Sequence, residues 1–215
     1  MLIVIEGADG TGKNTQRELL VNRLSKEGFN VKYHHYPDYD YDYGKMIRSY
    51  LDRAREMNVA ELLMVYLVDM IKDKSRMPQE LDDGSIVIFD RYFFSTIAYQ
   101  SSGGFDYEKA KKMVKLLDLK MPDVVFYLDV PVEISMERKD RQRMLEENRK
   151  GDRHESDKSL HKNIRKYYKQ MMKEGFGSRN WITIDAARKP KEVHASIMKA
   201  LTPMLEKAHA ARKIA

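Results

Sequence analysis

The sequence predicts an α/β fold in which a parallel sheet carries helices on both faces. Three observations support this prediction: short apolar runs alternate with longer amphipathic stretches, a glycine-rich loop follows the first apolar run, and turns such as Asp82-Asp83-Gly84 and Met121-Pro122-Asp123 precede later runs. Parallel strands need a long crossover connection, which is usually a helix, so regular alternation of this kind is typical of parallel sheets.

The individual elements follow from the same patterns. The apolar residues at 2–5 fit a buried strand, and Leu19, Leu20, Val21 and Leu24 recur at helical spacing. Strands are expected over 2–6, 30–35, 85–89, 124–129 and 181–184. Helices are expected over 14–27, 44–55, 58–82 (one helix or several), 94–101, 107–119, 131–146, 157–174 and 190–208, with a fraying end over 208–215.

Length and composition fit a small intracellular enzyme that forms a large single domain, or one domain with a mobile insertion. The chain has 215 residues, no cysteine and a net charge of +6, so it can bury a sizeable core and has no disulfide framework. Its basic residues are interspersed with acidic ones, which argues against nucleic acid as the main partner. No apolar run is long enough to span a membrane and the first strand begins at residue 2, so we expect no signal peptide and a cytoplasmic location.

The segment between the first strand and the first helix carries the strongest motif in the chain. It reads Gly7, Ala8, Asp9, Gly10, Thr11, Gly12, Lys13, Asn14 and Thr15. Its glycines let backbone N–H groups point at phosphate oxygens, Lys13 can reach the terminal phosphates, and the helix N-terminus adds a favourable dipole. The segment predicts the phosphate loop of a P-loop NTPase, with a polyphosphate nucleotide as its ligand.

The residue after the loop lysine departs from this motif. A Ser or Thr hydroxyl usually stands there to bind Mg²⁺, but this chain has Asn14. An amide oxygen can also bind a hard cation, so Asn14 is a candidate metal ligand. Thr15 cannot simply replace it, because one residue along a helix rotates the side chain by about 100°.

A second informative segment begins at the end of the strand predicted at 85–89. Asp90 and Arg91 come first, and Tyr92, Ser95, Ala98, Tyr99 and Gln100 follow. A carboxylate at this end of a strand beside a phosphate loop can hold hydrated Mg²⁺, and the adjacent guanidinium can bind a second phosphate with two hydrogen bonds. For the Asp-Arg pair alone, a surface ion pair is the alternative interpretation.

These motifs together resemble the thymidylate kinase family, whose members carry a Glu-Gly-x-Asp-Gly phosphate loop, an Asp-Arg-Tyr motif and a Ser-x-x-Ala-Tyr-Gln helix. Glu6, Gly7, Asp9 and Gly10 match the first motif, and further similarity covers 126–130, 152–155, 164–168 and 184–186. The resemblance therefore extends over effectively the whole chain. It implies a single kinase domain over 1–215, a mobile basic lid at about 138–156, ATP and Mg²⁺ as cofactors, and a homodimer.

The resemblance also implies a role for each matching residue. Lys13 and the loop amides would hold the donor phosphates, Arg91 the acceptor monophosphate and Asp9 the sugar 3′-hydroxyl. Asp90 and Glu6 would manage magnesium and nearby water, with Asn14 as the other metal candidate. The acceptor would be bound by Asp9, Tyr36, Tyr66, Arg91, Ser95, Tyr99 and Gln100. Two alternatives stay open, because Tyr99 can be a core residue and Glu6 can pair with a loop lysine.

The basic stretch at 137–143, with Arg149 and Arg153 beyond it, resembles the family's lid. A charge run on a helix is also typical of a solvated face. Some family members carry an arginine inside the phosphate loop where this chain has Gly10, so the lid is expected to supply that charge. Its catalytic candidates are Arg138, Arg141 and Arg143.

Two departures from the family pattern concern the acceptor. In the Phe-Pro-x-Arg segment, Tyr39 replaces an arginine that would contact the acceptor phosphate, and Lys45 or Arg48 can compensate. The Leu-Leu-Phe-Ala-Ala-Asp-Arg helix corresponds to 62–70 but lacks its arginine, so either Asp69 or Met70 occupies that place, with Tyr66 as the stacking ring. A carboxylate there would favour an amino-bearing base, whereas a thioether would discriminate little.

The resemblance thus predicts an ATP-dependent kinase that converts dTMP to dTDP and has no nucleic-acid or membrane partner. A kinase for another (deoxy)nucleoside monophosphate is the first alternative. A regulatory nucleotide-binding protein, such as a switch GTPase, is the second, although the sequence contains no Asn-Lys-x-Asp element for reading guanine.

Overall fold

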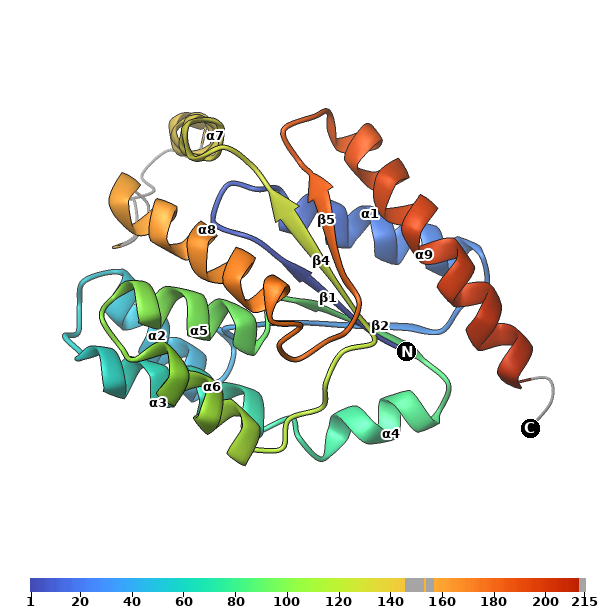
Figure 1. Ribbon diagram of the computed structural model, residues 1–215, viewed down its shortest axis with the longest axis horizontal. Helices are drawn as coiled ribbons and strands as arrows, with labels where there is room; N and C mark the ends of the chain where they lie inside the picture. The colour runs from blue at the N-terminus through green and yellow to red at the C-terminus, as the bar shows by residue number, and fades with distance from the viewer. Residues whose placement is uncertain (146–152, 154–156, 213–215) are drawn as a thin grey trace.

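A five-stranded parallel sheet forms the centre of the computed structural model, which describes residues 1–145, 153 and 157–212 (Figure 1). The strands are β1 (Leu2–Glu6), β2 (Val31–His35), β3 (Ile86–Asp90), β4 (Val124–Asp129) and β5 (Trp181–Asp185). Their order in the sheet is β2-β3-β1-β4-β5, so β1 lies in the middle. The five predicted strands are confirmed, with ends that shift by at most one residue.

Helices connect the strands and cover both faces of the sheet, as the sequence predicted. They are α1 (Lys13–Lys26), α2 (Asp42–Leu51), α3 (Val59–Ile71), α4 (Arg76–Asp82), α5 (Phe93–Ser102), α6 (Tyr107–Leu116), α7 (Val132–Leu145), α8 (Lys158–Lys173) and α9 (Pro190–Arg212). Figure 1 shows α1 and α9 together on one face and α3, α5, α6 and α8 on the other. Among the described residues, no helix is both long enough and apolar enough to cross a lipid bilayer.

The alternation of side chains along β1 builds the two halves of the core. Leu2 and Val4 pack with residues of α3, α5, α6 and α8, whereas Ile3 and Ile5 pack with residues of α1 and α9. These four side chains are fully buried. Because successive residues of a strand point to opposite faces, an uninterrupted apolar run is what a strand covered on both sides requires.

Helices α2, α6 and α9 differ most from the sequence prediction: α2 ends at Leu51 instead of residue 55, and α6 ends at Leu116 instead of residue 119. Residues 58–82 form two helices, α3 and α4, and α3 begins at a capping box between Asn58 and Glu61. Helix α2 begins at Asp42 instead of residue 44, where an acidic side chain in the first turn favours the helix dipole. The fraying end predicted for 208–215 is wrong for its first part, because α9 continues to Arg212 through alanines that favour helix.

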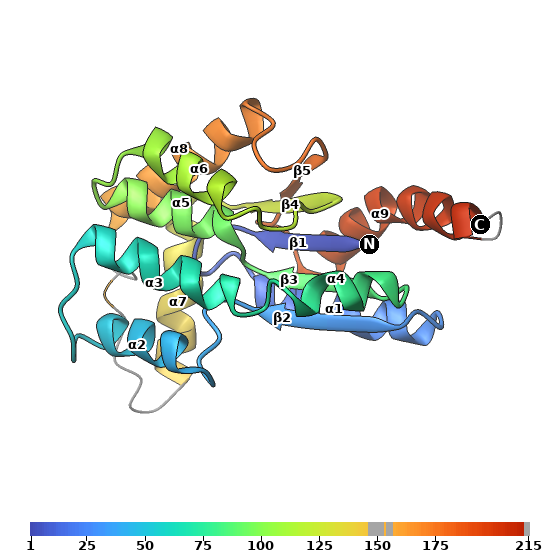
Figure 2. The ribbon, with the colours of Figure 1, turned by 90° about the horizontal axis from the view of Figure 1, so that it is seen from below.

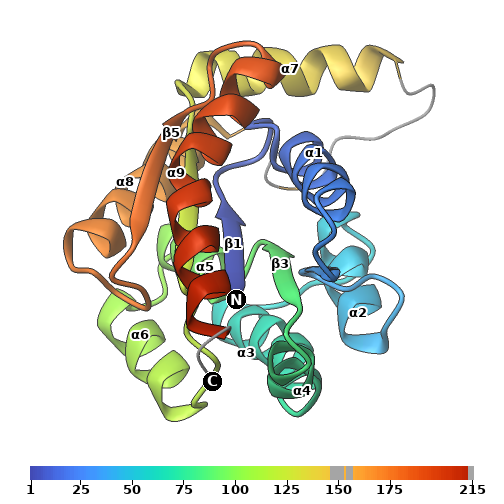
Figure 3. The same ribbon diagram turned by 90° about the vertical axis from the view of Figure 1, so that its right-hand side faces the viewer.

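The parallel register brings the carboxyl ends of β1, β3 and β4 to one edge of the sheet. Ile5 pairs with Asp90 on one side and with Phe126 on the other. The loops that follow these strands therefore lie side by side at that edge. Figure 2 shows α2, α3, α5 and α7 gathered around it, and Figure 3 shows α7 lying across the end to which β1 points.

Candidate active site

The phosphate loop connects β1 to α1 at the carboxyl edge of the sheet. Gly12 precedes α1 in a left-handed conformation with φ of 91°, and no side chain caps the helix. The first N–H groups of α1 are therefore available to an anion. Lys13 is buried beside them, and its Nζ donates to the Ala8 carbonyl at 2.8 Å. Burial and the nearby Arg91 guanidinium lower the pKa of Lys13 to about 8.

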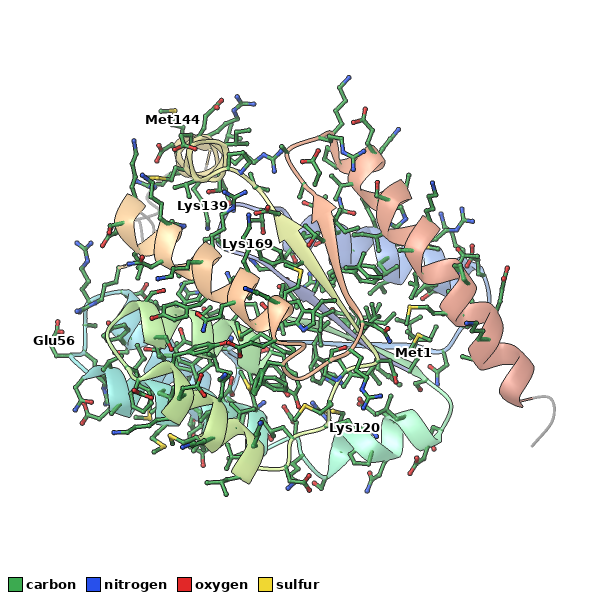
Figure 4. All side chains as sticks on the ribbon, in the orientation of Figure 1. Met1, Glu56, Lys120, Lys139, Met144 and Lys169 are labelled. Atoms are coloured by element: carbon green, nitrogen blue, oxygen red, sulfur yellow. The ribbon has the colours of Figure 1, made fainter. Side chains whose placement is uncertain are left out.

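A pocket of about 450 Å³, here called the donor pocket, opens above this loop. Three groups of residues line it: the phosphate loop, the end of β3 and helix α7. They are Asp9, Gly10, Gly12, Lys13, Asn14, Thr15, Asp90, Arg91, Arg138, Lys139 and Gln142. Figure 4 shows Lys139 on the side of α7 that faces the sheet, whereas the exposed Met144 lies on the outer side. Lys139 and Gln142 are donor-pocket residues that the sequence analysis missed.

Gly10 lets α7 pack directly on the phosphate loop. Its φ is 77°, and a Cβ at this position would lie 2.2 Å from the Ser135 carbonyl oxygen. A larger side chain therefore cannot occupy the position without moving the loop or the helix. This packing excludes an arginine at position 10, so the basic residues of the donor pocket are Lys13, Arg91 and two residues of α7.

The structure separates the three arginines predicted on the lid. Arg138 lines the donor pocket, but its guanidinium donates to the carbonyl oxygens of Ala186 and Ala187 at 2.9 and 3.0 Å. Arg141 is exposed and bonds to Glu137, and Arg143 lies 3.1 Å from Asp140, so neither lines the pocket. Lys139 is thus the α7 cation placed nearest the loop, with its Cγ 3.2 Å from the position of a Gly10 Cβ.

The rest of the predicted lid is described at one residue only. Within 146–156 the structure describes Arg153, whose guanidinium bonds to both carboxylate oxygens of Glu56 at 2.8 and 2.5 Å. Its Nε also donates to the Tyr50 carbonyl at the end of α2. Arg149 and its neighbours at 146–152 and 154–156 lie outside the described residues.

The predicted metal ligands, Asn14 and Asp90, both line the donor pocket. Among the described residues, no cluster of three or more His, Cys, Asp or Glu side chains could hold a metal alone. One amide and one carboxylate beside the phosphate loop fit Mg²⁺, which keeps several waters and takes its remaining oxygens from substrate phosphates. The residues present therefore suit a nucleotide-bound magnesium ion.

A second pocket, here called the acceptor pocket, lies beside the first and contains every substrate-binding residue that the sequence predicted. Its lining residues are Asp9, Tyr36, Pro37, Tyr39, Leu51, Tyr66, Met70, Arg91, Tyr92, Ser95, Thr96, Tyr99 and Gln100. They come from the phosphate loop, the β2–α2 loop, the connection between β3 and α5, and helices α2, α3 and α5. Tyr99 faces this pocket, so it is not only a core residue.

Arg91 and Asp9 line both pockets and bind each other. The Arg91 guanidinium also donates to the Gly7 carbonyl at 3.2 Å and to Ser95 Oγ at 3.0 Å, which fixes its direction. Arg91 has a φ of 68°, a left-handed conformation that costs an ordinary residue about 1–3 kcal/mol. The strain places a guanidinium where the two pockets meet.

Asp9 is held as a carboxylate at this junction. Its Oδ2 accepts from the Tyr99 hydroxyl at 2.8 Å, and its Oδ1 accepts from Arg91. Burial alone would raise the pKa of Asp9, but the Arg91, Lys13 and Lys139 cations lower it far below its ordinary value. The site therefore presents a fixed acceptor for a hydroxyl group next to a fixed guanidinium.

Glu6 lies at the end of β1 but is fully buried beneath the site. Its carboxylate accepts from the Tyr92 and Ser95 backbone N–H groups at 2.8 and 3.3 Å, and from the Ser95 and Tyr168 hydroxyls at 2.7 Å each. Burial raises its pKa even though these donors and Arg91 oppose the shift. Its hydrogen bonds hold the start of α5, and none of them comes from a loop lysine.

The structure distinguishes Asp69 from Met70, the two residues that could occupy the place of the family's arginine. Met70 lines the pocket together with Tyr66, whereas Asp69 turns away and accepts from the Asp38 backbone N–H at 2.9 Å. Tyr92 and Thr96 also line this pocket, and their buried hydroxyls have no hydrogen-bond partner among the described residues. The sequence motifs did not predict either as a pocket residue, although buried hydroxyls of this kind can bind a polar ligand.

The β2–α2 loop carries a tyrosine where the family pattern has an arginine. Tyr39 lines the acceptor pocket, and the Arg48 guanidinium carbon lies 4.0 Å from the centre of its ring. Arg48 therefore places a cation against Tyr39, whereas Lys45 is exposed and lies 3.4 Å from Asp42. Asp40 and Asp42 are also exposed, and Asp38 pairs with Lys72.

Two adjoining pockets at the carboxyl edge of a parallel sheet, one on a phosphate loop and the other walled by aromatic rings, define a P-loop phosphotransferase with a donor and an acceptor site. Comparison with known proteins narrows this class. The sequence model of thymidylate kinase matches residues 5–197 of the chain. The chain belongs to the thymidylate kinase family, whose members are ATP- and Mg²⁺-dependent phosphotransferases.

Individual relatives agree with this assignment. The thymidylate kinase of Plasmodium falciparum is 32% identical over 200 residues, which are 93% of this chain and 89% of that protein. The thymidylate kinase of Fervidobacterium nodosum is 35% identical over 212 residues, 95% of this chain and 100% of that protein. A probable thymidylate kinase of Thermococcus onnurineus is 39% identical over 152 residues, 64% of this chain and 70% of that protein.

Proposed function

We propose that the chain transfers the terminal phosphoryl group of ATP to dTMP, giving dTDP and ADP. The observation that supports this most directly is the position of Arg91, which lines both pockets and is fixed by Gly7, Ser95 and Asp9. Phosphoryl transfer needs alignment and charge neutralisation more than covalent help. A guanidinium between donor and acceptor phosphates supplies both.

The other residues then have separable tasks. Lys13 and the first N–H groups of α1 bind the donor phosphates, and Asn14 and Asp90 would hold the magnesium ion. That ion, when bound, neutralises charge that develops on the phosphate oxygens. Asp9 accepts a hydrogen bond from the sugar 3′-hydroxyl of the acceptor, and the side chains of Gln100 and Tyr66 lie against its base.

The pocket offers few charged groups for recognising the base of the acceptor. Met70 offers a thioether where the family pattern has a guanidinium, so a carbonyl on the base gains no cationic donor from this position. Neutral groups, the Thr96 and Tyr92 hydroxyls and the Gln100 amide, line the same pocket. A kinase for another (deoxy)nucleoside monophosphate is therefore the second candidate function.

A panel of acceptors tests the proposal. Steady-state kcat/KM is measured with ATP for dTMP, dUMP, dCMP and dGMP in a coupled assay of ADP release. We expect the highest value for dTMP. A higher value for another monophosphate would establish the second candidate, and failure of all four with slow ATP hydrolysis would refute the kinase assignment.

Three further properties belong to the same proposal. We propose that residues 1–215 act as one kinase domain, that the protein works in the cytoplasm, and that it is a homodimer. Light scattering on the eluting protein should give about twice the 25.3 kDa of the chain, and a mass of one chain at assay concentration would contradict the dimer.

A further inference from the structure

A largely buried ammonium group, that of Lys72, lies next to the wall of the acceptor pocket. Lys72 follows the last turn of α3, and its side chain is 9% exposed. Its Nζ lies 2.6 Å from Asp73, 3.0 Å from Asp38 and 3.5 Å from Asp69. One cation therefore bridges three carboxylates, two from α3 and its end and one from the β2–α2 loop.

Hydrogen bonds connect this cluster to the wall of the acceptor pocket. The Tyr36 hydroxyl donates to Asp73 Oδ2 at 3.0 Å, and the Asp38 backbone N–H donates to Asp69 Oδ2 at 2.9 Å. Tyr36 and the residues on either side of Asp38 line the pocket. The ammonium group also lies 5.2 Å from the centre of the Tyr36 ring. The cluster thus holds the segment that forms one wall of the pocket.

The charge balance of the cluster depends on Lys72. Among the ion pairs of the described residues, the three carboxylates have one other cationic partner, Arg76, which lies 2.9 Å from Asp73 and is 49% exposed. Burial disfavours the ammonium, but the Asp73 and Asp38 carboxylates outweigh it and hold the pKa of Lys72 above its ordinary value. Without Lys72, Asp38 and Asp69 would lose the cation that lies 3.0 and 3.5 Å from them, and their negative charges would repel each other.

We propose that Lys72 is a positioning residue for the acceptor: its single positive charge bridges Asp38, Asp69 and Asp73 and so holds the Tyr36–Tyr39 wall of the acceptor pocket in place. The inference rests on the proposed phosphoryl transfer to a monophosphate. Lys72 lines neither pocket, and the donor pocket contains no residue of this cluster. Loss of the Lys72 charge should therefore weaken binding of the acceptor and leave binding of the donor nucleotide nearly unchanged.

The test compares Lys72→Met with Lys74→Met in the full chain. Met removes the charge and keeps the length of the side chain, and Lys74 is a matched control because it is 45% exposed and bonds to the Leu117 carbonyl. In Lys72→Met we expect the KM for dTMP to rise by about tenfold or more. The KM for ATP should stay within about twofold, and kcat should fall less than kcat/KM for dTMP. Lys74→Met should match the parent in all three quantities.

Equal changes in the two KM values, or no change in a folded Lys72→Met protein, would overturn the inference. If Lys72→Met does not fold, Asp73→Ala decides, because it removes the acceptor of the Tyr36 hydroxyl and a partner of Lys72 at a residue that lines neither pocket. A raised KM for dTMP then supports the inference and an unchanged one refutes it. If the parent uses another monophosphate in place of dTMP, the proposed base is wrong, and the same comparison is made with that acceptor. If the parent uses none, both proposals fall.

Discussion

The Tyr168 hydroxyl joins helix α8 to the residues that hold Arg91, and it can be removed without changing the ring. Tyr168 is fully buried, and its hydroxyl lies 2.7 Å from both Glu6 Oε2 and Ser95 Oγ. Ser95 Oγ in turn accepts from Arg91. Tyr168→Phe therefore deletes one donor from a buried network that ends at the junction of the two pockets.

The structure sets the size of the expected effect. A buried carboxyl group that loses a hydrogen-bond partner costs about 1–3 kcal/mol. Glu6 keeps three donors, two backbone N–H groups and the Ser95 hydroxyl, so the network should survive while the protein becomes less stable. With a urea m-value of about 2–3 kcal/mol/M, the unfolding midpoint should fall by about 0.3 to 1.5 M.

Urea unfolding followed by circular dichroism measures this change, and the adjacent tyrosine provides the control. The Tyr167 ring stacks on Tyr107 at 5.2 Å and is only partly buried. Tyr167→Phe should shift the free energy of unfolding by no more than about 0.5 kcal/mol. If Tyr168→Phe is as stable as Tyr167→Phe, the hydrogen bonds of the Tyr168 hydroxyl to Glu6 and Ser95 do not stabilise the fold.

Three further predictions concern the site itself. The pKa of Lys13 is about 8 in the free protein, and a bound triphosphate favours its ammonium form. The calorimetric Kd for ATP should therefore rise as the pH increases above 8, and Lys13→Met should lose this pH dependence. An equal pH dependence in both proteins would contradict the prediction. Arg91→Ala should lower kcat/KM for dTMP by about 10²- to 10³-fold, and wild-type kcat/KM for every monophosphate would rule out its role at the acceptor. Asn14→Ser and Asn14→Thr should lower the magnesium concentration that gives half-maximal activity at fixed ATP, because a hydroxyl is the usual ligand there; unchanged or higher demand in both means that Asn14 is already a competent ligand or does not face the metal.

The sequence alone determined the fold class and the phosphate loop because both depend on local patterns. A buried strand shows as an apolar run, a covering helix shows as a period of 3.6, and the loop binds phosphate largely through its own backbone. The position of Asp90 and Arg91 was also predictable from the sequence. They follow a strand of the same parallel sheet, and the carboxyl ends of parallel strands lie at the edge of the sheet that carries the phosphate loop.

Contacts between distant segments were decided by the tertiary structure. The alignment of α3 with the family pattern was uncertain by one residue, so the sequence did not distinguish Asp69 from Met70. The packed structure does, because Asp69 accepts a hydrogen bond from the Asp38 backbone N–H while Met70 lines the acceptor pocket. The charge run at 137–143 gave no direction for its side chains. On α7, the approach of Gly10 to Ser135 places Lys139 toward the loop and leaves Arg141 in solvent.

Glu6 shows the physical reason most clearly. The sequence shows a carboxylate next to a phosphate loop, which is compatible with a metal ligand, an ion pair or a structural group. Its role depends on which donors reach it, and these come from positions 86 to 162 residues away in the chain, at Tyr92, Ser95 and Tyr168. Local sequence specifies backbone conformation and the pattern of burial, whereas the partners of a buried charge are fixed only when the remote segments have packed around it.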